Sequence, residues 1–148
     1  MGITMALSFN ILAQSPDHAE VQGVIEELFE GMREGDSSRV SGIFHPEVRM
    51  MTSYRAEDGS PMLKEGTLKG FLDAIGTPHP EVWNEEIWNT EIRIDQELAQ
   101  VWTDYAFYVG EKFSHCGIDA FQLVRGSDGR WRIIHLIDTR RREPCERP

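Results

Sequence analysis

A titratable pair lies on a segment that is otherwise typical of a buried strand. Residues 112–124, KFSHCGIDAFQLV, carry His115 and Asp119 on one face, with Gly117 between them. Imidazole and carboxyl groups serve as general acids and bases once burial and neighbouring charges tune their pKa. Four residues along a strand span about 13 Å, so these two side chains cannot bond to each other and need partners from neighbouring strands. The pattern predicts a polar site on an apolar wall.

The strands on either side supply such partners if both hairpin turns are tight. With two-residue turns at 110–111 and 127–128, Trp102 would lie opposite Asp119, and Asp104 opposite Gly117. A β-bulge would shift this register. Without one, the face that carries His115 and Asp119 also gathers Trp102, Asp104, Tyr108, Asp138 and Arg140, with Leu136 at its apolar end.

Two interpretations of this face stay open. In the first, His115 is an acid or base, Asp104 or Asp138 orients it, and Asp119 exchanges a hydrogen bond with a ligand. A cyclic or planar organic molecule would then contact the ligand-binding candidates, which are Trp102, Tyr108, Tyr54, Asp138, Arg140 and Leu136. In the second, the same charges form a structural ion-pair network that shifts pKa values without doing chemistry.

Helical periodicity dominates the first part of the chain. Residues 15–17, SPD, combine a capping hydroxyl, a proline and an acid, which is typical of a helix start, and Gly35 is a helix stop. Asp36 can cap a second, short helix that ends where His45 precedes Pro46.

Strand signals dominate the rest. Asp58-Gly59 predicts a hairpin turn, and a third helix is expected at 67–75. Four strands then follow in succession, at about 82–94, 98–109, 113–125 and 130–141. The order predicts an α+β domain over 17–141, with three helices on one face of a curved, mostly antiparallel sheet. Residues 1–16 would be an extension and 142–148 a flexible tail.

Both faces of the predicted sheet are largely apolar or aromatic, so both need a cover. The helices cover one face at one end only, which leaves a cone-shaped cavity of the kind that binds small molecules. A second copy of the chain is the simplest cover for the other face, and we expect a homodimer through the sheet.

Charge and composition exclude several classes of partner. The 148 residues hold 15 Lys and Arg against 25 Asp and Glu, a formal charge of −10, which repels nucleic acids and anionic membranes. No apolar run of about 18 residues predicts a membrane span. No spacing of histidines and carboxylates predicts a metal, and no phosphate-binding loop predicts a cofactor.

The location of the protein is open from its sequence. Cys116, in a predicted strand, and Cys145, in the tail, do not have the pattern of a disulfide framework or a metal site. The apolar first 15 residues lack the Lys or Arg of a signal peptide. We therefore expect a cytoplasmic protein, with export as the alternative.

The element order and two segments resemble a known family. The opening EVQGVIEELFEGMREGDSSRVSGIFHPEV and the closing FQLVRGSDGRWRIIHLIDTRR are similar to the NTF2-like superfamily of cone-shaped α+β barrels, and in particular to its SnoaL-like and lumazine-binding proteins. The resemblance covers about residues 17–141. It implies a pocket inside the cone and is compatible with a cofactor-independent lyase, dehydratase or cyclase. The alternative is a non-enzymatic dimeric module.

The superfamily includes ketosteroid isomerases, whose catalytic residues can be carried over by position. The tyrosine that donates to the oxyanion falls on Leu28, the aspartate base on Thr52, and the protonated aspartate on Asp119. Only the last is kept, so the resemblance implies no isomerase activity, but it does imply that Asp119 faces the pocket.

Overall fold

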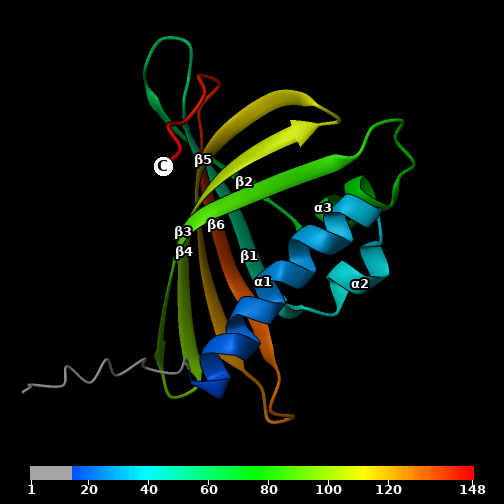
Figure 1. Cartoon of the computed structure of the whole chain (residues 1–148), viewed down its shortest axis with the longest axis vertical. Coiled ribbons are helices and arrows are strands. Elements are labelled where there is room, and N and C mark those ends of the chain that lie inside the picture. The colour runs from blue at the N-terminus through cyan, green and yellow to red at the C-terminus, as the bar shows by residue number, and fades with distance from the viewer. Residues whose placement is uncertain (1–14) are drawn as a thin grey trace, which may run out of the picture.

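One curved sheet, with helix α1 lying across it, organises the chain (Figure 1). The computed structural model describes residues 15–148. Its helices are α1 (Pro16–Glu34), α2 (Ser37–Ser41) and α3 (Leu68–Gly76). Its strands are β1 (Phe44–Arg55), β2 (Pro61–Gly66), β3 (Trp83–Asp95), β4 (Leu98–Val109), β5 (Lys112–Arg125) and β6 (Trp131–Arg140). The sheet order is β2-β1-β6-β5-β4-β3, and only β1 and β6 pair in parallel among these neighbours. The predicted α+β fold is confirmed.

Helix α1 begins and ends where the sequence predicts. The Ser15 hydroxyl accepts a hydrogen bond from the backbone N–H of His18 at 3.3 Å, and Pro16 occupies the first turn. Gly35 closes the helix with a left-handed φ of 69°, a conformation that costs glycine little. The buried face of α1 packs on the sheet, with Phe29 edge-on to Phe121 of β5 at 6.4 Å between ring centroids.

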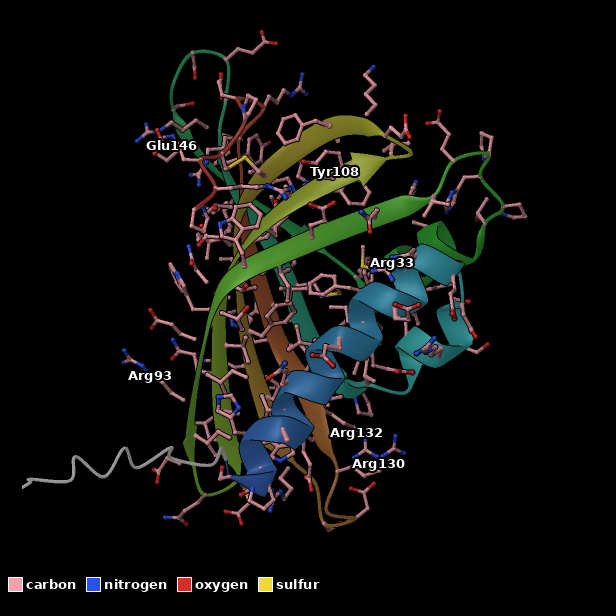
Figure 2. The ribbon with its side chains drawn as sticks, in the orientation of Figure 1. Arg33, Arg93, Tyr108, Arg130, Arg132 and Glu146 are labelled. Carbon is pink, nitrogen blue, oxygen red and sulfur yellow. A yellow bond between two sulfur atoms is a disulfide. The ribbon has the colours of Figure 1, made fainter. Side chains whose placement is uncertain are left out.

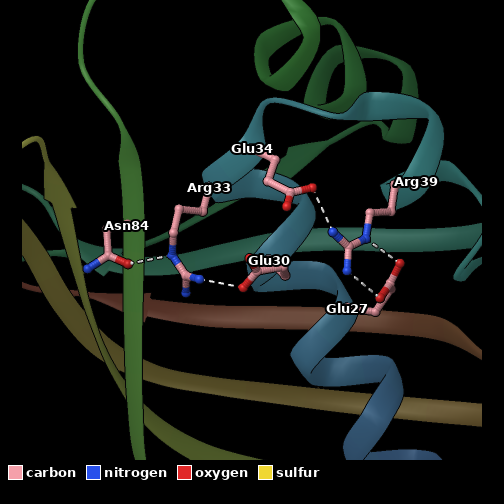
Figure 3. Close-up of polar contacts among 6 residues, drawn as sticks. All are labelled: Glu27, Glu30, Arg33, Glu34, Arg39 and Asn84. Atoms are coloured by element: carbon pink, nitrogen blue, oxygen red, sulfur yellow. Dashed lines mark hydrogen bonds and ion pairs between the residues drawn. The ribbon is translucent and has the colours of Figure 1, made fainter.

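Two arginines fix the C-terminal half of α1 (Figure 3). Arg39, from α2, pairs with Glu27 and Glu34 of α1, at 2.9 Å and 2.6 Å for the contacts of its two terminal nitrogens. Arg33 donates from Nε to the side-chain oxygen of Asn84 on β3 at 3.2 Å. The Arg39 contacts hold α2 against α1, and the Arg33 contact holds α1 against β3, next to the position of Glu85.

The second helix is shorter than predicted. It ends at Ser41, and Phe44 already pairs with Ile133 of β6. The β1–β6 register shifts between Phe44 and Arg49, so Pro46 lies in an irregular stretch where its missing N–H breaks no ladder. His45 therefore belongs to a strand rather than to a helix end.

A bulge corrects the predicted register of β4 and β5. Val109 pairs with Lys112 as expected, but Phe107 then pairs with His115, because one extra residue of β5 is accommodated there. Beyond the bulge Thr103, not Trp102, lies opposite Asp119. A one-residue slip moves a whole strand's side chains to the other face. Trp102, Asp104 and Tyr108 consequently lie on the face opposite His115 and Asp119.

The C-terminal tail is joined to the sheet. Arg141 pairs with Cys116 of β5 through both backbone hydrogen bonds, and Cys116 forms a disulfide with Cys145. Arg147 lies 4.7 Å from the ring centroid of Trp88. The positions of Cys116 and Cys145 in the sequence do not predict a disulfide, and the structure corrects this, because β6 brings the tail beside Cys116. The same contacts restrain the tail that the sequence predicts to be flexible.

The disulfide predicts the thiol count of the purified protein. Unfolded without reductant, the chain should take up no alkylating reagent, and after reduction it should take up two equivalents, one at Cys116 and one at Cys145. Intact-mass spectrometry gives both numbers. Two alkylations before reduction would contradict the pairing.

Candidate functional site

A groove of about 2090 Å³ lies between the concave face of the sheet and the helices. Its apolar walls come from α1, α3 and the sheet and include Leu28, Phe29, Met32, Phe71, Phe121 and Leu136. Its polar lining includes Tyr54, Glu85, Tyr105, His115, Asp119, Asp138 and Arg140. Apolar walls with a few convergent polar groups are typical of small-molecule sites.

Asp138 is the best satisfied of the buried carboxylates. Its Oδ1 accepts from the Thr52 hydroxyl at 2.6 Å, and its Oδ2 accepts from Arg140 Nε at 2.7 Å. The Tyr105 hydroxyl lies 3.1 Å from the same Oδ2 and 2.8 Å from the carbonyl oxygen of Thr139, so its single proton is shared between them. Burial, and then the charges of Asp138 and Asp119, raise the pKa of Tyr105, which stays a neutral donor.

Glu85 and Asp119 form a second, very different acidic pair. Asp119 is 4% exposed, and its Oδ2 has no hydrogen-bond partner among the described residues. The carboxyl of Glu85, from β3, faces that of Asp119, and the two can form a hydrogen bond only while one of them is protonated. Burial, opposed in part by that hydrogen bond, raises the pKa of Glu85 to about 7, and burial together with the charge of Glu85 raises the pKa of Asp119. Both carboxyls therefore keep their protons to a higher pH than usual, and near pH 7 the pair can give or take a proton.

His115 is a neutral imidazole in this site. Burial and the positive charge of Arg140 lower its pKa to about 4. Its Nδ1 lies 3.0 Å from the Ser114 hydroxyl, and its ring packs edge-on to Tyr105 at 5.8 Å. Neither Asp104 nor Asp138 is hydrogen-bonded to it, so the predicted orienting carboxylate is wrong on both candidates.

Gly117 is explained by the strand next to it. A Cβ atom there would lie 2.0 Å from the carbonyl oxygen of Thr139, the same oxygen that accepts from Tyr105. The side-chain oxygen of Thr139 accepts from the backbone N–H of Ile118 at 2.9 Å. Only glycine lets β6 come this close to β5, and this approach sets Tyr105 beside Asp138.

The structure brings together most, but not all, of the residues singled out from the sequence. Six of them line the groove: His115, Asp119, Asp138, Arg140, Leu136 and Tyr54. The three from β4, which are Trp102, Asp104 and Tyr108, do not, because of the bulge. The positions that correspond to the isomerase residues, Leu28, Thr52 and Asp119, all line it.

On the outer face, the three β4 residues have other surroundings. Trp102 is 48% exposed and borders a shallow hollow of about 210 Å³ with Glu91, Arg93 and Gln100. In Figure 2, Arg93 points away from the sheet on the side opposite α1. Asp104 accepts from the side-chain amide of Asn89 at 3.1 Å, and Tyr108 accepts from Arg147 at 2.9 Å.

Sequence reasoning missed two residues of the groove. Glu85 lies in WNEEIWN, where acids occupy both faces of the strand, so alternation alone does not single it out. The available signal was that Glu85 has the same parity as Trp83 and Ile87, which marks an acid on an apolar face. The register predicted from tight turns would place Tyr105 on the face opposite His115 and Asp119, and the bulge reverses that placement.

Within residues 15–148, no group of three or more His, Cys, Asp or Glu side chains is arranged to hold a metal ion. No helix in that range has both the length and the apolar character needed to cross a membrane.

Known proteins resemble this chain in fold. A solved NTF2-like protein with a cystatin-like fold from Novosphingobium aromaticivorans is 10% identical, with a TM-score of 0.67, over 87% of this chain and 84% of that one. An NTF2-like protein of unknown function from Shewanella baltica is 19% identical, with a TM-score of 0.62, over 87% and 95%. A "putative dehydratase from the NTF2-like family" of Streptomyces avermitilis is 14% identical, with a TM-score of 0.61, over 84% and 96%.

Identities this low show a shared fold and leave the activity to be argued from the site. No curated protein matches the chain. The family model described as "Putative lumazine-binding" matches residues 16–136, which is most of the chain. The chain therefore belongs to that family, and it shares its fold with the NTF2-like proteins described above.

Proposed function

We propose that this protein binds a small cyclic or planar organic molecule in the groove and that its acidic pair moves a proton on that molecule. The observation that carries the proposal is Asp119 Oδ2, a buried acceptor without a partner in the described structure, on the wall of an apolar groove. A buried polar atom without a partner is costly to the fold, so its retention is best explained by a ligand that completes it.

The groups around that atom fit cofactor-independent acid and base chemistry. The Glu85–Asp119 pair can exchange a proton near neutral pH, so one carboxyl can remove a proton while the other donates one. The Tyr105 proton is engaged by Asp138 and Thr139 and holds Asp138 in place. His115 is a neutral imidazole beside them. Elimination of water, or ring closure, needs one group to remove a proton and another to donate one. A lyase, dehydratase or cyclase is therefore the reaction class that we propose.

The test compares two aspartates on opposite faces of the sheet. Lumazine is the first probe, chosen for the family to which the chain belongs, and its fluorescence reports binding. Asp119→Ala should weaken binding at least about tenfold, the loss of roughly one hydrogen bond to a buried group. Asp104→Ala, on the outer face, should leave the Kd unchanged. Equal affinity of Asp119→Ala and the parent protein, with both folded, would overturn the proposal.

A second candidate role is that of a dimeric module, and the outer face favours dimerisation. Trp102 is half exposed there, and the exposed Leu98 lies on the same strand face, about 13 Å along the strand. We propose that a second copy covers this face, which is compatible with ligand binding in the groove. Light scattering coupled to size exclusion should give twice the chain mass, and Trp102→Lys should give a monomer. A monomeric parent protein at micromolar concentration would exclude this interface.

The disulfide bears on location. Structural disulfides persist in oxidising compartments and are rare in the cytosol. The Cys116–Cys145 pair therefore supports the exported alternative over the cytoplasmic one. Fractionation of the native host, with the oxidation state of both cysteines measured in each fraction, distinguishes the two.

A further inference from the structure

The chemical class of the ligand can be argued from the charges on the groove floor. This inference rests on the proposed function and goes one step beyond it. Three carboxyls lie there, those of Glu85, Asp119 and Asp138, each from a different strand. Asp138 forms an ion pair with Arg140, whereas Glu85 and Asp119 form none within residues 15–148. One guanidinium thus faces three carboxyls.

The balance of charge at the floor is negative even when the acidic pair holds a proton. Asp138 and Arg140 offset each other through their 2.7 Å contact. Once Glu85 ionises, above about pH 7, the pair carries a negative charge beside the buried Asp119, which is costly without a counter-charge. The remaining cations that line the groove, Arg55, Lys64, Lys112, Arg141 and Arg142, are exposed. Among the cations that line the groove, Arg140 is the one whose charge lowers the pKa of both Glu85 and Asp119.

The acidic pair also has one oxygen to which no described residue donates a hydrogen bond. Asp119 is 4% exposed, and its Oδ2 has no donor within the described residues although it lines the groove. The partners available to Asp119 from neighbouring elements are acceptors or are already engaged. Glu85 can donate only the proton of its own carboxyl, which it loses on ionising. The Tyr105 proton serves Asp138 and Thr139, and Thr52 donates to Asp138.

We propose that the groove takes a ligand with a basic nitrogen, a cationic amine or amidine-like group whose N–H donors contact Glu85 and Asp119. A pair of N–H groups on a planar cation matches two carboxyl oxygens as an arginine fork does. The apolar walls formed by Phe29, Phe121 and Leu136 take the ring system that carries it. An anionic ligand would instead bring a like charge to the pair.

The experiment uses three probes of one shape and different charge at neutral pH: 2-naphthamidine, 2-naphthamide and 2-naphthoate. Isothermal titration calorimetry on the full chain should give at least a tenfold tighter Kd for the amidine than for the amide, and weaker binding still for the naphthoate. The double variant Glu85→Gln/Asp119→Asn should erase the preference for the amidine. Glu86→Gln/Asp104→Asn, which removes two charges from the outer face, should keep it.

Proton release gives a second readout that a merely apolar groove would not produce. Near pH 6 both carboxyls hold most of their protons, because the pKa of Glu85 is about 7 and that of Asp119 is raised as well. A bound cation favours the ionised pair, so about one proton or more should leave per amidine bound. Titrations in buffers of different ionisation enthalpy measure that number. His115, Tyr105, Asp138 and Arg140 are the other charged or titratable groups facing the pair, and the double variant separates their contribution.

The outcomes distinguish this inference from the function on which it rests. If the amide or the naphthoate binds as tightly as the amidine, the inference is wrong, while small-molecule binding stands. If the amidine binds without proton release and equally to the double variant, the inference is also wrong. If none of the three probes binds, the inference fails, and the lumazine titration decides whether the proposed function fails with it.

Discussion

Replacement of Gly117 by alanine is expected to lower the free energy of unfolding by about 3 kcal/mol, from overpacking and the loss of hydrogen bonds. The added Cβ would lie 2.0 Å from the Thr139 carbonyl oxygen and 2.7 Å from its Oγ1, which is too close for either atom. Strand β6 must move, and the bonds that Thr139 accepts from Tyr105 and from the Ile118 backbone would weaken with it. For a domain of this size, the Tm should fall by about 6–12 °C.

A matched glycine provides the control for this variant. Gly23 is exposed on α1, and a Cβ there would meet no atom within 4 Å. Gly23→Ala should therefore raise stability, by up to about 1 kcal/mol, through helix propensity alone. Urea unfolding of both variants measures whether each one raises or lowers the free energy of unfolding. An unchanged midpoint for Gly117→Ala would mean that β5 and β6 are not packed this closely and that Gly117 has no role in setting Tyr105.

Most of the fold can be predicted from local sequence patterns. The cap at Ser15 and the stop at Gly35 bound α1 because each depends on a few adjacent residues. The turns around Gly59, Gly110 and Gly129 were equally readable, and each of these glycines has a positive φ. Turn chemistry and periodicity are local properties, so they survive without any knowledge of tertiary contacts.

The site was only half predictable because it depends on non-local register. His115 and Asp119 were placed on one face by parity within a single strand, which no bulge between them disturbs. Trp102 and Asp104 were placed by counting across a turn, and one extra residue in β5 reversed their face. The same limit hid the Cys116–Cys145 disulfide, because the path of the tail past β5 is fixed by tertiary packing and not by local pattern.

The pH dependence of stability is expected to contain two opposing contributions from the groove. The folded pKa of Glu85 is about 7 against an ordinary 4.5, so the folded protein keeps a proton that the unfolded chain has released. That contribution is fully present below pH 4.5 and is lost as the pH rises through about 7. The raised pKa of Asp119 acts in the same direction.

His115 acts in the opposite direction over an overlapping range. Its folded pKa is about 4 against an ordinary 6.5, so the unfolded chain binds a proton that the folded protein does not. Stability from this group is lowest below pH 4 and rises until about pH 6.5. Between pH 4.5 and 6.5 the two contributions to the free energy of unfolding therefore change in opposite directions. In the parent protein they offset each other, so neither is seen alone.

Variants separate the two slopes. The free energy of unfolding of Glu85→Gln/Asp119→Asn, relative to that of the parent protein, should rise by about 3 kcal/mol between pH 4 and pH 8. The reason is that only the parent must ionise this pair inside the groove. The free energy of unfolding of His115→Asn, relative to that of the parent protein, should fall by about 2 kcal/mol between pH 4 and pH 6.5, after allowance for solvent screening. Urea unfolding at four pH values measures both differences.

The control removes the same two charges from the neighbouring positions on the outer face. Glu86→Gln/Asp104→Asn keeps the groove intact, and its stability difference from the parent should stay nearly constant with pH. A pH-independent difference for the inner double variant as well would mean that Glu85 and Asp119 reach water freely. The acidic pair would then be an ordinary surface pair, and both its role in proton transfer and the preference for a cationic ligand would lose their physical basis, since each needs a proton held by burial.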